Sequence, residues 1–154
     1  MRVAIGGDHA GFPLKAVILR AVEALGHEAT DLGSYDETPV DFPDITRRVC
    51  AAILGGSADR AILVAGTGVG VAIAANKIPG IRASVCHDGH TARQCVEHDD
   101  VNVMCIGAKI VGPWLAADLV RTYLHARFSG DADATRRVAQ LRQLERDASG
   151  RPGE

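Results

Sequence analysis

A glycine-rich segment, GTGVG at residues 66–70, is the part of the chain best suited to hold negatively charged oxygen. Gly66, Gly68 and Gly70 can take turn conformations that other residues avoid, and can point successive backbone N–H groups to one side. The helix expected to follow adds the partial positive charge of its first turn. A phosphate or a developing oxyanion would fit there, although a plain tight turn accounts for the same glycines.

The glycine segment matches neither of two common nucleotide-binding motifs. The dinucleotide motif needs G-x-G-x-x-G in the first strand–helix turn and an acidic residue about 20 positions later. The P-loop motif ends in Gly-Lys-Ser/Thr, whereas this segment continues as VAIAANK. A nucleotide-binding module is therefore disfavoured.

Two pairs of neighbouring side chains could move protons. Asp8 and His9 stand between glycines in GGDHAG, and His98 and Asp99 open HDDVN. Imidazoles and carboxylates are common general acids and bases. Each pair also has a structural interpretation: Asp8 as a helix cap beside a solvated His9, and His98 as a favourable cation at a helix end. Because ligands of open parallel sheets lie beyond the carboxyl ends of the strands, we expect both pairs and the glycine segment to meet there.

Two further clusters have other interpretations. CHDGH at residues 86–90 contains metal-ligating residue types, but no further ligand follows at a characteristic spacing, so we predict no metal. Arg136, Arg137 and Arg142 either form a solvated helix face or hold a phosphate.

These residues lie at the ends of elements that alternate regularly between strand and helix. Short apolar runs predict strands at residues 2–7, 27–33, 60–66, 81–88 and 101–110. Helical periodicity predicts helices at residues 12–26, 44–56, 71–77, 89–98, 112–128 and 134–149. Such alternation is typical of right-handed crossovers and a parallel sheet. We predict a Rossmann-like α/β fold, a three-layer αβα sandwich with a five-stranded parallel sheet, whose last helix reaches toward a partner subunit.

Length and composition restrict the class of protein. The 154 residues suit one domain, which we place at residues 1–148, before a disordered tail at 149–154. A net charge of −2 and only 4% aromatic residues disfavour nucleic acid as a partner. No apolar run approaches the roughly 18 residues of a membrane span, and no secretory signal opens the chain. The four cysteines form no C-x-x-C pair, so we expect free thiols and a cytoplasmic protein.

Several segments, taken in order, resemble one family. The chain is similar to the type B ribose-5-phosphate isomerase family, which includes galactose-6-phosphate isomerase subunits. The segments that carry the similarity are GGDHAGFPLK, DFPD, GTGVGVAIAANKIPGIRA, the histidine before DDVNV, and IGAKIVG. The resemblance extends from Arg2 to about Arg146. It implies aldose–ketose isomerisation of a sugar phosphate, ribose 5-phosphate to ribulose 5-phosphate first, through a cis-enediolate. It also implies a homodimer or tetramer with active sites at the subunit interface, and neither a metal nor an organic cofactor.

The resemblance also assigns roles to individual positions. His98 matches the residue that helps to open the sugar ring, and Asp8 matches its polar partner. Thr67 and the backbone of residues 66–70 match the loop that stabilises the enediolate oxygens. The other positions expected to bind substrate, chiefly its phosphate, are His9, Asp99, Lys109 and one of the pair Arg136 and Arg137.

The chain departs from the family where the family keeps its base for the carbon-bound proton. That base is a cysteine directly before the glycine segment or a glutamate directly after it, but Ala65 and Val71 occupy these positions. Loss of a positioned base typically costs about 10²- to 10⁴-fold in rate. Near the C-terminus, GDADATRRV also lacks one arginine of the family pattern.

Three explanations for Ala65 and Val71 remain open. The chain is an active isomerase in which Asp8, His98 or Asp99 takes the proton. Alternatively, it is an impaired or non-catalytic subunit that binds a sugar phosphate. In the third, Ala65 is an engineered replacement for the base.

Overall fold

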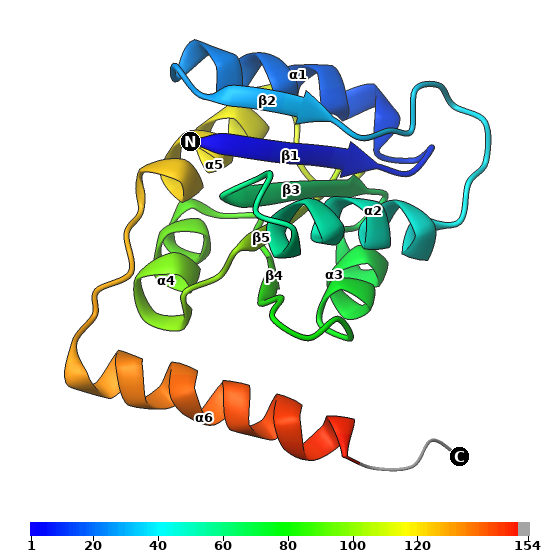
Figure 1. The fold of residues 1–154 in the computed structure, drawn as a ribbon. Coiled ribbons are helices and arrows are strands. Elements are labelled where there is room, and N and C mark those ends of the chain that lie inside the picture. The colour runs from blue at the N-terminus through cyan, green and yellow to red at the C-terminus, as the bar shows by residue number, and fades with distance from the viewer. Residues whose placement is uncertain (151–154) are drawn as a thin grey trace.

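The computed structural model describes residues 1–150 as a parallel sheet with helices on both faces (Figure 1). The strands are β1 (Arg2–Gly7), β2 (Glu28–Asp31), β3 (Arg60–Ala65), β4 (Ala83–Val85) and β5 (Val103–Gly107). Their order across the sheet is β2-β1-β3-β5-β4, and every neighbouring pair is parallel. The predicted five-stranded parallel sheet and Rossmann-like class are confirmed.

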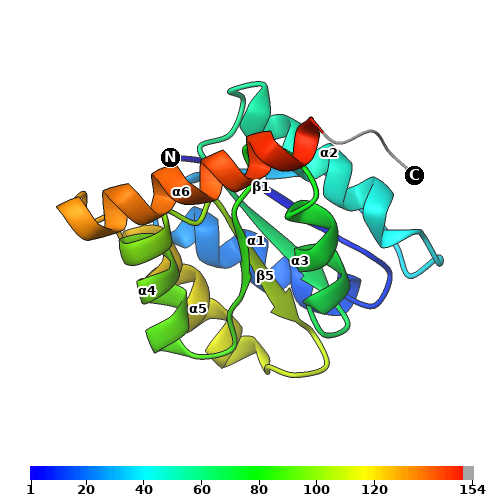
Figure 2. The ribbon, with the colours of Figure 1, turned by 90° about the horizontal axis from the view of Figure 1, so that it is seen from below.

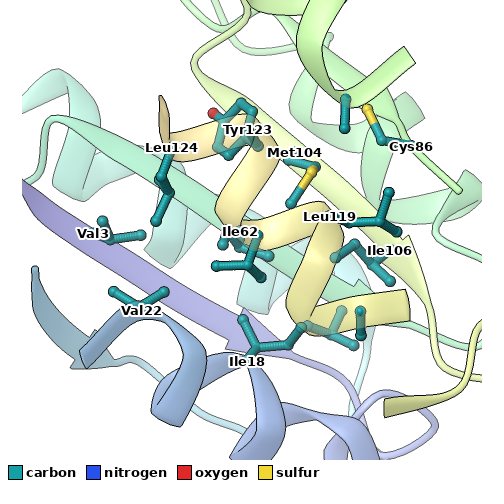
Figure 3. Close-up of a cluster of buried hydrophobic side chains, with 14 of the residues drawn as sticks. Val3, Ile18, Val22, Ile62, Cys86, Met104, Ile106, Leu119, Tyr123 and Leu124 are labelled. Carbon is teal, nitrogen blue, oxygen red and sulfur yellow. The ribbon is translucent and has the colours of Figure 1, made fainter. Parts of the chain in front are cut away.

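Two apolar clusters bind the helices to the sheet. The helices are α1 (Phe12–Ala24), α2 (Phe42–Leu54), α3 (Val69–Ala75), α4 (Gly89–Asp99), α5 (Pro113–His125) and α6 (Ala132–Ser149). Successive strand side chains point to opposite faces, so β3 places Ile62 and Val64 on one side and Leu63 and Ala65 on the other. The first side packs against α1, α4 and α5, and the second packs against α2 and α3. Figure 3 shows side chains of α1 and α5 in the first cluster, among them Ile18 and Leu119.

The last helix lies below this sandwich in Figure 1 and runs across it in the view from below in Figure 2. It begins at Ala132, two residues before the predicted start, because the Asp131 side chain accepts the Ala134 N–H at 2.8 Å and caps it. α6 rests on α4 and leaves a cavity of about 720 Å³ beside β4, while Leu141 and Leu144 are 44% and 65% exposed. Of the tail predicted at 149–154, residues 151–154 lie outside the described residues.

No helix within residues 1–150 is both long and apolar enough to cross a membrane. All four cysteines are buried and free.

A buried ammonium ties α1 to the end of β2. Lys15 is only 3% exposed, and its Nζ donates to Asp31 Oδ1 at 2.7 Å and to the Ser34 carbonyl oxygen. The same Nζ lies 5.0 Å from the centre of the Tyr35 ring. We expect Lys15→Met to lower the free energy of unfolding by about 2–3 kcal/mol, because Asp31 loses its partner. Urea denaturation measures this.

The exposed pair Arg47–Asp44 provides a matched control for Lys15. Its nitrogen and oxygen lie 3.1 Å apart on α2, and both side chains are about two-thirds or more exposed. Arg47→Met should change the free energy of unfolding by less than about 0.5 kcal/mol, because solvent screens the pair. If the two substitutions lowered the free energy of unfolding equally, burial would not increase the stabilisation that the Lys15 contacts provide.

Candidate functional site

One group of the expected residues gathers at the carboxyl edge of the sheet. Asp8 and His9 follow β1, the glycine segment follows β3, and Lys109 follows β5. The arrowheads of β1 and β3 in Figure 1 point toward this edge. Backbone bonds join two of these turns, since Ala65 and Gly66 accept the N–H groups of Ala108 and Lys109 at 2.8 and 3.0 Å.

The glycine segment forms a tight turn into α3. Gly68 has a φ of 79°, in the left-handed region that favours glycine, and a Cβ there would lie 3.2 Å from the backbone of Ile106. Thr67 is exposed at the tip. Because α3 has only seven residues, the loop amides and the Thr67 hydroxyl are the main groups that could bind an anion.

The first turn brings a carboxylate next to this loop. The Asp8 N–H donates to the Val64 oxygen at 3.2 Å, which continues the β1–β3 register and makes Asp8 the neighbour of Ala65. Asp8 is 8% exposed, and its Oδ1 accepts the Gly11 N–H at 2.9 Å. Within residues 1–150, Oδ2 accepts no hydrogen bond. Asp8 therefore supports the turn with one oxygen and leaves the other available.

Two cationic or titratable side chains flank the same loop. The Val40 N–H donates to His9 Nδ1 at 3.3 Å. Nε2 is therefore the ring nitrogen of His9 that remains for a ligand. Lys109 runs beside the glycine segment: a Cβ on Gly66 would lie 3.7 Å from Lys109 Cδ and Cε. The Nε2–H of His9 could therefore donate a hydrogen bond to an anion bound at this edge, and the Lys109 ammonium could also balance its charge.

A second group lies at the junction of α4 and α6. A cavity of about 410 Å³ is lined there by Gln94, His98, Asp99, Asp131, Asp133, Ala134 and Arg137. His98 is exposed and its Nδ1 lies 3.4 Å from Gln94 Nε2. Asp133 holds both arginines of the expected pair, Arg136 at 2.6 Å and Arg137 at 3.7 Å.

The expectation that His98 and Asp99 also lie at the carboxyl edge is wrong. Every strand of the sheet is parallel, and α4 returns the chain from the end of β4 to the start of β5. Its last residues, 98 and 99, therefore lie at the amino edge, opposite the glycine segment. A single chain thus divides the expected site residues into two half-sites.

Ala65 and Val71 leave no side-chain base directly against the loop backbone. They are 5% and 0% exposed and pack in the apolar cluster under α2 and α3. Neither side chain carries an ionisable group, so a carbon-bound proton near this loop must go to another residue.

Within residues 1–150, the side chains of CHDGH do not gather into a group of three or more possible metal ligands. Asp88 instead caps α4, because its carboxylate accepts the Thr91 N–H at 2.8 Å and the Thr91 hydroxyl at 2.6 Å. These bonds lower the pKa of Asp88. His87 belongs to the same cluster, but its Nε2 accepts the Gly107 N–H at 2.8 Å, a contact that the residue types did not indicate. Its position two residues after the end of β4, at the carboxyl edge of the sheet, was the available signal.

Comparisons with known proteins agree with these features. The chain matches the model of a family described as Ribose/Galactose Isomerase over residues 3–141. Ribose-5-P isomerase B of Listeria innocua is 40% identical over 130 residues, 84% of this chain and 88% of the relative. D-erythrulose-4-phosphate isomerase of Pectobacterium atrosepticum is 38% identical over 137 residues, 87% and 89% of the two chains. The solved structure of Clostridium thermocellum ribose-5-phosphate isomerase B is 42% identical, with a TM-score of 0.92 over 96% of this chain and 99% of that chain.

Proposed function

The chain belongs to the ribose/galactose isomerase family, and we propose on this basis that it interconverts the aldose and ketose forms of a sugar phosphate. Ribose 5-phosphate and ribulose 5-phosphate are the first candidates, because several relatives bear that name. A relative named for a tetrose phosphate makes shorter sugars the next candidates. The observation that carries the proposal is the carboxylate of Asp8 beside an anion-binding loop at the carboxyl edge.

We propose that a second copy of the chain completes the site. His98 and Arg137 lie at the opposite edge from the loop of their own chain, so they can serve only the loop of a neighbour. The exposed leucines of α6 and the exposed Val69 and Ile73 of α3 provide apolar surface for such a contact. In a two-fold dimer each copy contributes the loop half of one site and the His98 half of the other. A tetramer would keep this arrangement.

In this scheme Asp8 is the base for the carbon-bound proton. Its Oδ2 accepts no hydrogen bond within residues 1–150, and its backbone is the register neighbour of Ala65, directly before the loop. The carboxylate removes the proton from the carbon next to the carbonyl, which leaves an enediolate, and returns it to the neighbouring carbon. One such positioned base contributes about 10²- to 10⁴-fold in rate.

The remaining residues would open the ring, stabilise charge and hold the phosphate. His98 of the second copy exchanges protons with the ring oxygen and the anomeric hydroxyl of the sugar. Thr67 and the loop amides donate to the enediolate oxygens, where one donor is worth about 3 kcal/mol. His9, Lys109 and an arginine of the pair Arg136 and Arg137 would bind the phosphate, with Asp99 lining the sugar. The scheme uses no metal or organic cofactor, and the buried free thiols support a cytoplasmic location.

Incubation with aldose phosphates in D₂O tests the proposal. Purified protein is mixed with ribose 5-phosphate, erythrose 4-phosphate and galactose 6-phosphate, and NMR follows ketose formation and deuterium at the carbon next to the carbonyl. We expect a ketose from at least one sugar. Binding by calorimetry without exchange would indicate a subunit that only binds, and neither binding nor turnover would refute the substrate class.

A further inference from the structure

A histidine with no role in this scheme, His87, forms a hydrogen bond with the last residue of β5. His87 lies two residues after the end of β4, and its Nε2 accepts the N–H of Gly107, the last residue of β5, at 2.8 Å. A ring nitrogen that accepts a hydrogen bond carries no proton, so the imidazole is neutral here with its proton on Nδ1. His87 is half-buried, whereas its neighbours Asp88 and His90 are exposed.

Gly107 lies directly behind the anion-binding loop. A Cβ on Gly107 would come within 2.8 Å of the Cα and carbonyl carbon of Thr67, so the two backbones are in tight contact. The next two residues donate their N–H groups to Ala65 and Gly66. The backbone of residues 65–67 thus rests on the turn at 107–109, and His87 holds that turn from the far side.

We propose that His87 is a positioning residue for the reaction: its neutral ring fixes Gly107 against Thr67 and so holds the loop donors where the enediolate oxygens form. The inference rests on the proposed isomerase function. It assigns no contact between His87 and the substrate. Protonation turns Nε2 into a donor that faces another donor, the Gly107 N–H, so the contact is lost and the loop loses its support.

The surroundings of His87 keep the neutral form dominant near neutral pH. Burial lowers the pKa of His87, and the carboxylate of Asp88, next in the chain, opposes this with a smaller effect. The other titratable groups near the contact in the chain are the thiol of Cys86, between β4 and His87, the thiol of Cys105 on β5, and the ammonium of Lys109, two residues beyond Gly107. Because the pKa is lowered in the folded state, the contact stabilises the protein above the ordinary histidine pKa of 6.5, and this stability is lost as the pH falls below it.

Three variants separate positioning from simple packing. His87→Gln places an uncharged amide oxygen at nearly the same reach as Nε2, so it keeps the acceptor at every pH. His87→Leu keeps the volume and removes the acceptor. His90→Gln makes the same chemical change at an exposed position and serves as the matched control.

Kinetics of these variants give the first readout. For His87→Leu we expect kcat to fall about 10- to 100-fold, while KM changes less than about threefold, because a small displacement of aligned groups costs mainly the reaction step. His87→Gln should keep kcat near wild type at pH 8. As the pH falls toward 5, its kcat should exceed that of wild type by a growing factor, and His90→Gln should follow wild type.

The amide signals of Gly107 and Thr67 give a readout that needs no activity. In wild type both should shift together with the His87 ring as it titrates, and in His87→Gln neither should shift over that range. The positioning role is overturned if His87→Leu folds with wild-type kcat, or if His87→Gln and wild type share one pH profile. If the two amides follow the ring while the wild-type protein converts no sugar phosphate, the contact stands and the proposed function fails.

Discussion

We expect Asp8→Asn to lower kcat for aldose–ketose conversion by about 10²- to 10⁴-fold, the usual worth of a positioned base. The asparagine oxygen can still accept the Gly11 N–H that Asp8 Oδ1 accepts at 2.9 Å, so the turn after β1 is retained. The substitution removes the negative charge and the carboxylate oxygen that accepts no hydrogen bond within residues 1–150. The measurement is the initial rate with ribose 5-phosphate and with erythrose 4-phosphate.

A second substitution identifies what Asp8 does. Ala65 lies opposite Asp8 in the continued register of β1 and β3, so a thiol introduced by Ala65→Cys could take over a carbon-bound proton. We expect the double variant Asp8→Asn/Ala65→Cys to have a kcat at least about tenfold higher than that of Asp8→Asn alone. Erythrose 4-phosphate forms no five-membered ring, because its phosphate blocks the hydroxyl that would close it. Full activity of Asp8→Asn on this sugar alone would therefore assign Asp8 to ring opening and contradict its role as carbon base.

The largest effect on stability is expected for Gly11→Ala. Gly11 packs against the Val64 carbonyl so closely that an added Cβ would overlap the Val64 oxygen and carbon and lie 2.8 Å from the Ala65 nitrogen. All three atoms belong to the backbone of a central strand, which cannot move aside as a flexible side chain can. We expect a loss of at least about 3 kcal/mol in the free energy of unfolding, or no folded protein. Thermal and urea denaturation measure it.

Gly89→Ala is the matched control for Gly11→Ala. Gly89 begins α4, and a Cβ there would meet no atom within 4 Å. Alanine also has the higher helix propensity, so we expect a change of no more than about 1 kcal/mol, favourable or not. If Gly11→Ala were as stable as Gly89→Ala, the result would contradict a close contact between the turn after β1 and the backbone of β3.

The sheet could be predicted because its pattern is local. Residues 61–64 are apolar without interruption, which is typical of a parallel strand buried on both faces, and β3 lies at the centre of the sheet. The run at 27–33 is more polar, which is typical of a strand with one side open to solvent, and β2 is an edge strand. The start of α6 was missed by two residues because the Asp131 cap is a side-chain bond within a loop.

The site could be predicted only in part. Asp8, the glycine segment and Lys109 follow strands, so their common edge is a consequence of parallel order. His98 precedes β5, so the same parallel order places it at the amino edge. Its residue type suggested a place at the carboxyl edge, and that prediction was wrong. The bond between His87 and Gly107 joins residues 20 positions apart through the side chain, which no periodicity reveals. The pairing of Arg136 and Arg137 with Asp133 likewise depends on how α6 begins.

The acidic surroundings of the second half-site bear on the choice of sugar. Asp131 and Asp133 lie in the cavity with Arg137, and Asp133 contacts both arginines of the pair. Hydrogen bonds from the Ala134 N–H and the Ser129 hydroxyl lower the pKa of Asp131, so its carboxylate stays charged. A phosphate that binds an arginine here must compete with these carboxylates, which favours substrates whose phosphate also reaches His9 and Lys109.

The central claim is that one site takes Asp8 from one copy and His98 from another, and mixing two inactive variants tests it most directly. Asp8→Asn and His98→Asn are each expected to lose activity, but after subunit exchange the mixed dimers contain one site with both residues intact. An equal mixture should recover about one quarter of the wild-type rate, because half of the dimers are mixed and half of their sites are complete. A mixture that forms mixed dimers by native mass spectrometry, yet stays as inactive as the separate variants, would contradict the account.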